Sequence, residues 1–195
     1  MVAEVSVVEI NGAAGTPTYT TISGAGVSIT ARYCTTDSYN PGMDNPIPIP
    51  STSAYLNRSY WKTHCLEIQG TFTQVNNIRF YPEQDLGWTV GPDGFVSYGI
   101  DAGGDYGMPS GNYEQATGTL GKSGDALTDH TWVDSTGNLY TDFEALSTME
   151  VDADGNTNDT HFFSNCVLTQ VVVDSGATSG TMSDKLYTWV YDEIS

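Results

Sequence analysis

The sequence predicts an all-β protein, a β-sandwich or jelly-roll-like fold that is loop-rich and has little helix. Short apolar runs recur along the chain between clusters of glycine, proline, asparagine and aspartate, a pattern typical of sandwiches. The 195 residues include 12 tyrosines and 21 glycines, and threonine and valine are frequent, which favours strands joined by turns. One sandwich accommodates this length, so we expect residues 1–195 to form a single domain.

The first half of the chain contains the clearest strand patterns. Residues 5–10 predict a strand that ends at the turn signal Asn11-Gly12. Strict alternation over residues 27–33 predicts a half-buried strand whose odd-numbered side chains share one face. Residues 60–68 predict a further strand, which bends at Gly70 and continues over residues 71–75.

The pair Asn76-Asn77 predicts a turn, and residues 78–81 predict a short strand ended by the following proline. From residue 85 to residue 159 glycine and aspartate dominate, so we interpret this stretch as an acidic, loop-rich insertion. Minor strands are expected within it at residues 95–100 and 132–133. Residues 142–151 are the one helix candidate.

The last third of the chain contains the strongest core candidate. Residues 162–173 are apolar on both faces, which predicts a central strand covered on both sides or covered by a neighbouring subunit. Residues 185–191 predict a final strand with Tyr187, Trp189 and Tyr191 on one face. That face suits core packing, and it also suits contact with a partner or a sugar.

The charge balance limits the classes of partner. The chain has 24 aspartates and glutamates against six lysines and arginines, a formal net charge of −18. Nucleic-acid binding needs a basic footprint, and anionic membranes repel such a chain, so we expect neither direct nucleic-acid nor membrane binding. The expected partners are neutral or cationic surfaces, or protein surfaces shaped to fit.

The cysteines and the amino-terminal residues carry no sorting or metal signal. Cys34, Cys65 and Cys166 are odd in number and widely spaced, so we expect three buried small side chains rather than a disulfide framework. The first residues show no basic segment of a secretory signal. No apolar run approaches the ~20 residues that span a bilayer. We therefore expect a soluble protein that stays in the compartment of its synthesis.

Residues 41–53 predict an extended, proline-rich arm. Its centre alternates two residue types: Pro46, Ile47, Pro48, Ile49 and Pro50. Proline fixes φ and removes a backbone donor, and a residue before proline is pushed out of the helical region. The arm is therefore stiff and presents two isoleucines, either to a partner or to its own core.

The residues that could carry chemistry do not form a recognisable set. His64, His130 and His161 lack the spacing of a zinc site, and no nucleophile, phosphate-loop or dinucleotide motif occurs. Among 24 acidic residues some pair will suit a glycosidase by chance, so none is singled out. We expect no enzymatic activity and no cofactor.

Asp152, Asp154 and Asn156 form a weak calcium candidate. An EF-hand loop needs glycine at its sixth position and glutamate at its twelfth, and here those places hold Thr157 and Phe163. A looser calcium turn and an ordinary solvated turn both remain compatible with these residue types.

Four stretches in order resemble a family of tailed-virus (phage-like) structural proteins. They are residues Glu4–Gly12, Asn45–Pro50, Gly70–Tyr81 and Trp189–Ile194. The resemblance implies a virion component associated with the head and without catalytic residues, and it leaves a decoration protein, a shell protein and a tail part open. Of these we favour a capsid decoration or cement protein, made in the host cytoplasm, because an acidic loop-rich half and a stiff arm suit binding to a repeating shell. Its implied partners are the major capsid protein or other virion proteins, and it is expected to form a homo-oligomer.

From the residues themselves we expect the partner contacts to involve the arm first, and the terminal strand, residues 187–194, second. A different class of function remains open. A carbohydrate- or receptor-binding module, such as a tail or surface adhesin, would use exposed aromatic side chains of the acidic stretch, among them Trp88 and Trp132.

Overall fold

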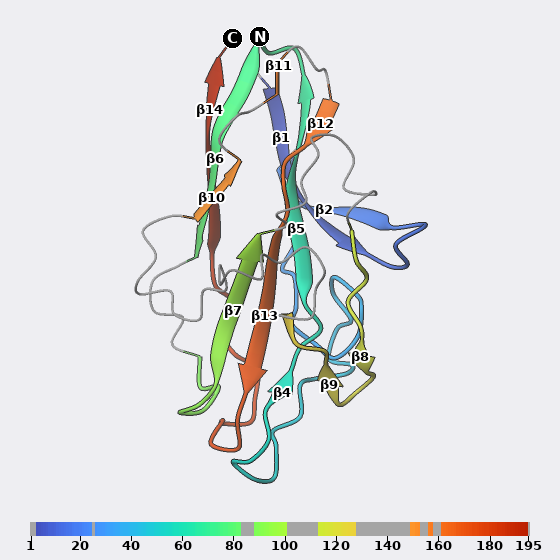
Figure 1. Ribbon diagram of the computed structural model, residues 1–195, viewed down its shortest axis with the longest axis vertical. Coiled ribbons are helices and arrows are strands. Elements are labelled where there is room, and N and C mark those ends of the chain that lie inside the picture. The colour runs from blue at the N-terminus through green and yellow to red at the C-terminus, as the bar shows by residue number, and fades with distance from the viewer. Residues whose placement is uncertain are drawn as a thin grey trace.

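The computed structural model describes residues 3–24, 26–82, 88–100, 113–127, 149–152, 156–157 and 161–194. These residues form an all-β fold of two antiparallel sheets and a small hairpin, and contain no α-helix (Figure 1). The sandwich-like all-β class predicted from the sequence is confirmed.

The larger sheet has eight strands in the order β3-β2-β1-β5-β13-β4, with β12 paired to β5 and β7 paired to β13. The bounds are β1 (Ala3–Asn11), β2 (Thr18–Gly24), β3 (Val27–Ser28), β4 (Asn57–Arg58), β5 (Lys62–Gly70), β7 (Phe95–Ile100), β12 (His161–Phe163) and β13 (Val167–Val173).

The smaller sheet is centred on β6 (Gln74–Pro82). On one side of it lies β14 (Tyr187–Ile194), and on the other lie β10 (Met149–Asp152) and β11 (Asn156–Thr157). A separate two-stranded hairpin consists of β8 (Gly118–Thr119) and β9 (Ser123–Gly124). Several pieces of the acidic stretch thus belong to the sandwich itself, β7 in one sheet and β10 and β11 in the other.

The main hydrophobic core lies between the two sheets. Side chains of β6 such as Val75, Ile78 and Phe80 pack in one buried cluster with Ile68 of β5 and Val171 of β13. Each large apolar side chain moved out of water contributes about 1.5–3 kcal/mol. This cluster is therefore the main source of the attraction that holds the sheets together.

The outer face of the larger sheet is covered by residues 113–127. Leu127 packs in a buried cluster with Leu168 of β13. Gln170 fastens this cover, because its Oε1 accepts from Leu127 N at 3.0 Å and its Nε2 donates to Ser59 O at 2.8 Å. All seven residues of β13 are buried, so the predicted two-sided burial of this strand is confirmed, with this chain providing both covers.

Most expected strands are present, and the exceptions have local causes. The strand expected over residues 27–33 is wrong beyond Ser28, because the chain leaves the sheet edge there and Tyr33 reaches into the interior. Residues 162–173 form β12 and β13 rather than one strand. Ser164 breaks the ladder, since its hydroxyl accepts from Leu66 N at 2.9 Å.

The turn expected at Asn76-Asn77 is also wrong. Both residues lie within β6, and Asn77 has φ of 50°. Opposite it the register with β14 shifts between Val190 and Asp192. Asparagine tolerates the left-handed conformation, and here that conformation forms a β-bulge rather than a chain reversal.

Residues 149–151 of the helix candidate are in strand β10, and the rest of that candidate lies outside the described residues. The strand expected at residues 132–133 lies outside them as well.

Candidate functional site

The proline arm lies on its own domain. Thr35 N donates to Asn45 O at 2.8 Å, and Asn57 Nδ2 donates to Pro48 O at 2.6 Å. Ile47 packs against the main core, and Pro50 is buried. Of the two isoleucines, only Ile49 remains exposed.

Two further segments join the arm at the same end of the molecule. In the β8–β9 hairpin, Gly121 N donates to Thr35 O at 3.2 Å, and Ser123 Oγ accepts from Arg58 N of β4 at 3.0 Å. In Figure 1, β4, β8 and β9 lie at the end opposite the two termini.

These segments carry large apolar side chains in solvent. The exposed fractions are 72% for Met43, 37% for Ile49, 68% for Tyr55 and 65% for Leu120. We call these four residues the arm-end surface.

The terminal strand directs its aromatic side chains inward. Tyr187, Trp189 and Tyr191 pack against the main core, and the first two contact the Phe80 ring edge-on at centroid distances of 5.4 and 5.2 Å. The opposite face of β14 carries Val190 and Ile194 in solvent. Those two are the apolar side chains that this strand offers to a partner.

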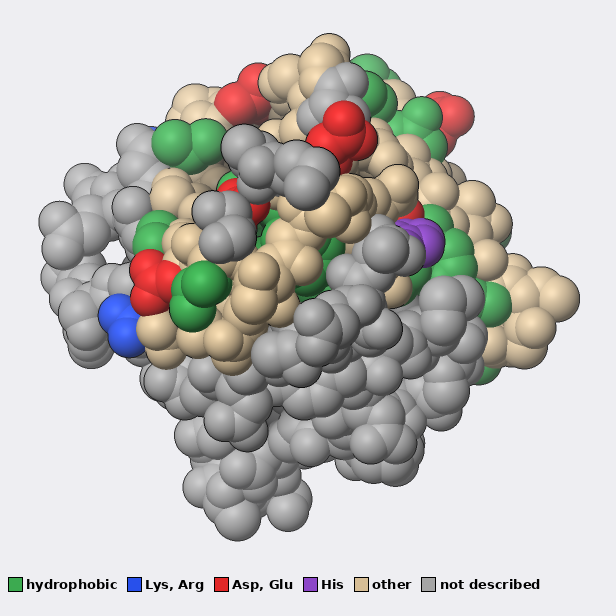
Figure 2. Space-filling model, turned by 90° about the horizontal axis from the view of Figure 1, so that it is seen from above, with side chains coloured by type: hydrophobic (Ala, Val, Ile, Leu, Met, Phe, Trp, Pro, Cys, Tyr) green, Lys and Arg blue, Asp and Glu red, His purple; other side chains and the backbone are tan. Residues whose placement is uncertain are grey.

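Three of the four stretches singled out in the sequence meet at the other end. They form β1, β6 and β14, and Ala3 N of β1 donates to Glu193 Oε1 of β14 at 2.9 Å. Figure 2 looks onto this end. Most of the side chains visible there are uncharged, and acidic side chains are more frequent than basic ones. The arm stretch lies at the opposite end.

The interior contains a charged cluster that the sequence patterns did not predict. Glu9 of β1 is fully buried, and its carboxylate accepts from Lys62 Nζ at 2.9 Å and contacts His64 Nε2 at 3.1 Å. Burial by itself raises the pKa of Glu9, but the Lys62 ammonium and the His64 ring outweigh burial and lower that pKa to about 2. The sequence predicts the strands at residues 5–10 and 60–68, but the pairing of Glu9 with Lys62 and His64 depends on the register between them, which local sequence patterns do not contain.

The cluster continues to the end of β1. Asn11 Nδ2 donates to Glu9 Oε1 and to Asp37 Oδ1, each at 3.1 Å. Asp37 Oδ2 accepts from Gly12 N at 2.8 Å and from Gln115 Nε2 at 2.9 Å. A carboxylate therefore holds the turn after β1 and the outer cover together.

Tyrosine hydroxyls lie in the same interior layer. Tyr33 OH donates to Thr169 Oγ1 at 2.6 Å and lies 2.7 Å from Tyr187 OH. Burial raises the pKa of both phenols well above their usual range. Both hydroxyl groups are therefore protonated at neutral pH, and neither acts as a general base there.

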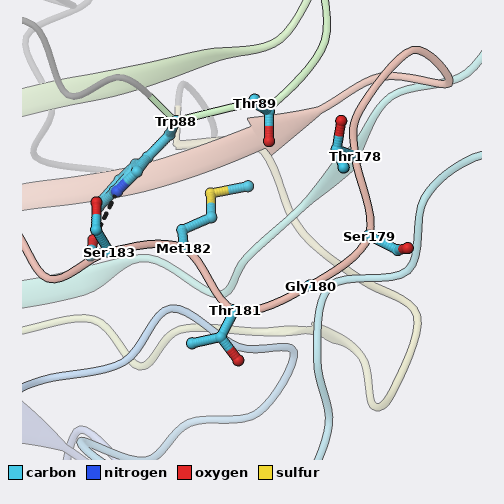
Figure 3. A pocket seen from close by; sticks show the side chains of 8 residues that line it. All are labelled: Trp88, Thr89, Thr178, Ser179, Gly180, Thr181, Met182 and Ser183. Carbon is cyan, nitrogen blue, oxygen red and sulfur yellow. Dashed lines mark hydrogen bonds between the residues drawn. The ribbon is translucent and has the colours of Figure 1, made fainter.

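A small groove lies beside Trp88 (Figure 3). Its volume is about 240 Å³, and it is lined by Trp88, Thr89, Thr178, Ser179, Gly180, Thr181, Met182 and Ser183. Trp88 Nε1 donates to Ser183 O at 2.9 Å, and its ring meets Tyr33 edge-on. The groove is smaller than the ~300–1,000 Å³ usual for ligand sites.

Several predicted features lie outside the described residues, namely Asp154, His130 and Trp132. Asp152 and Asn156 belong to β10 and β11. Within the described ranges no three His, Cys, Asp or Glu side chains come together as a metal site.

The cysteines agree with the expectation of buried small side chains. Cys34, Cys65 and Cys166 are buried thiols, and no disulfide joins any two of them. In the part of the chain that the structure describes, no helix is long and apolar enough to cross a membrane.

Comparison with known proteins adds no identification: no family model, curated protein or solved structure matches this chain.

Proposed function

We propose that this protein is a non-enzymatic structural component of a tailed-virus particle, a capsid decoration or cement protein that binds the shell through protein–protein contacts. One observation carries the proposal: the arm is fixed to its own domain while Ile49 and three other large apolar side chains face solvent at the same end. The ordered resemblance of four sequence stretches to virion proteins supports it.

The arm-end surface has the physical properties of a docking surface. Its backbone is held by hydrogen bonds from Thr35 and Asn57, so little conformational entropy is lost when a partner binds. A few well-buried apolar anchors supply most of the free energy of a typical protein interface. Met43, Ile49, Tyr55 and Leu120 are exposed apolar side chains of suitable size for such anchors.

The charge supports the same proposal. A net charge of −18 keeps the rest of the surface soluble while one apolar end is attached. The proposed partner is the major capsid protein or another virion protein with a neutral or basic apolar recess. The proposed location is the virion, where repeated sites favour a symmetric homo-oligomer.

The experiment is co-sedimentation with capsids of the virus particle to which this protein is proposed to belong. Ile49→Asp combined with Leu120→Asp should abolish binding while the variant keeps its fold and a cooperative thermal transition, because neither side chain is buried. Ile29→Asp is the matched control, since it places the same charge on a similarly exposed apolar site just after β3, outside the arm-end surface. Capsid binding by the double variant at the wild-type level would refute the docking surface.

A carbohydrate-binding module is the second candidate, and the groove beside Trp88 favours it, because threonine and serine residues line this groove together with one aromatic ring. A glycan array probed with the wild-type protein and with Met182→Ala tests this candidate. Figure 3 shows Met182 projecting beside Trp88 and Thr89, so truncation would alter affinity for a bound sugar. A signal equal in both proteins, or no signal, removes the candidate.

A further inference from the structure

Asn11 is the last residue of β1 and Lys62 is the first residue of β5, and the two lie opposite each other in the sheet. In the antiparallel ladder Glu9 lies opposite His64 and Ile10 lies opposite Thr63. Continuing this register by one residue brings Asn11 opposite Lys62. Directly opposite residues have Cβ atoms about 4.5–5.5 Å apart and share a face of the sheet.

A single carboxylate oxygen joins the two side chains. Glu9 Oε1 accepts from Lys62 Nζ at 2.9 Å and from Asn11 Nδ2 at 3.1 Å. The amine and the amide nitrogen therefore lie within two hydrogen-bond lengths of each other. Exposure is 2% for Lys62, 0% for Glu9 and 9% for Asn11, so bulk water does not surround the three groups.

We propose that Lys62 and Asn11 form an intramolecular amide bond in the folded protein, with Glu9 moving the proton between the two nitrogens. The product is a covalent link between β1 and β5, and it does not depend on the proposed virion function.

The step balances without any external reagent. Because the pKa of Glu9 is about 2 in the resting pair, Glu9 takes a proton from the Lys62 ammonium only transiently, and the link therefore forms slowly. The transient free amine attacks Cγ of Asn11 to form a tetrahedral intermediate. Glu9 then delivers the proton to Nδ2, and the Cγ–Nδ2 bond breaks. The side-chain amide of Asn11 becomes an amide to Nζ, and ammonia leaves with the remaining proton as ammonium.

The surroundings favour this step over the competing reaction of an Asn-Gly pair. Asp37 Oδ1 also accepts from Asn11 Nδ2 at 3.1 Å, so two carboxylates stabilise the departing ammonium. Succinimide formation would need Gly12 N to attack the same carbon. That nitrogen is engaged with Asp37 Oδ2 at 2.8 Å.

The test is the intact mass of the purified full-length protein under denaturing, reducing conditions. The wild-type chain should be lighter than its sequence requires by one ammonia. Trypsin should then fail to cleave after Lys62, and the peptide ending at Arg32 should be joined to residues 59–79 in one branched product.

Three variants make the result specific. Lys62→Arg and Asn11→Ala should have the full mass their sequences require, and Glu9→Gln should lose most of the link. A succinimide has the same mass loss as the link, but hydroxylamine opens it and it needs no lysine. Wild-type protein of full sequence mass, or a mass loss that persists in Lys62→Arg, overturns the proposal, and neither measurement requires the Glu9 variant to fold.

Discussion

Replacing Gln170 with leucine should weaken the attachment of the outer cover to the larger sheet. Gln170 is 1% exposed, and its amide makes three hydrogen bonds to the backbone: Leu127 N, Ser59 O and Asp125 O at 3.0, 2.8 and 2.7 Å. Leucine has a similar volume, so packing changes little and the polar contacts are lost almost in isolation.

The expected cost follows from those contacts. A typical hydrogen bond contributes about 1 kcal/mol net, and a buried donor left without a partner costs about 1–3 kcal/mol. Leu127 N loses its acceptor in a buried position, while leucine recovers part of the loss as apolar burial. We expect the free energy of unfolding to fall by about 3 kcal/mol, and the thermal midpoint by roughly 10 °C for a domain of this size.

Urea unfolding followed by tryptophan fluorescence measures this change. Gln69→Leu is the matched control, because Gln69 is exposed and makes one solvent-accessible bond to Glu67. The control should change the free energy of unfolding by no more than about 0.5 kcal/mol. A loss below about 1 kcal/mol for Gln170→Leu, or equal losses in both variants, would refute the role assigned to this side chain.

Two further outcomes are expected. Asp174→Ala should lower the free energy of unfolding by about 2 kcal/mol, because this buried carboxylate accepts hydrogen bonds from the backbone nitrogens of Asp93 and Gly176. Chemical denaturation measures this change, and a near-neutral effect would contradict the role given to Asp174. Burial raises the pKa of Tyr33 and of Tyr187 in the folded protein. Their contribution to the free energy of unfolding is therefore fully present below the ordinary phenol pKa near ~10 and is lost as pH rises above it. Phenolate absorbance should accordingly reach its full amplitude only when the chain unfolds. Full, reversible titration of all tyrosines in folded protein near that pH would contradict this.

The sequence predicted the elements that depend on local pattern. Residues 95–100 match β7, and the expected strand at 5–10 lies within β1. Alternation and flanking turn residues suffice there, because the strand period and the burial of one face produce the same signal. The stretch at 27–33 has the same alternation, yet Ile29 is exposed, since alternation does not tell whether a neighbouring strand is present.

The candidate site was predictable only in part. The stiffness of the arm follows from its prolines, but which isoleucine faces the core depends on the distant Thr35 and Asn57 that fix the arm. The same holds for Glu9, whose neighbours in sequence do not show that Lys62 will lie beside it. Contacts across many residues require the register of β1 against β5, which local patterns do not contain.

Residues 34–38 connect the buried cluster to the arm-end surface. Ser38 O accepts from Lys62 Nζ, and Asp37 holds Gly12 at the end of β1. In the same segment, Thr35 binds Asn45 of the arm and Gly121 of the hairpin. Because these contacts are continuous, a substitution at Lys62 would also loosen the backbone that positions the arm. Loss of partner binding in such a variant would therefore be indirect, and only substitution of exposed side chains such as Ile49 tests the contact itself.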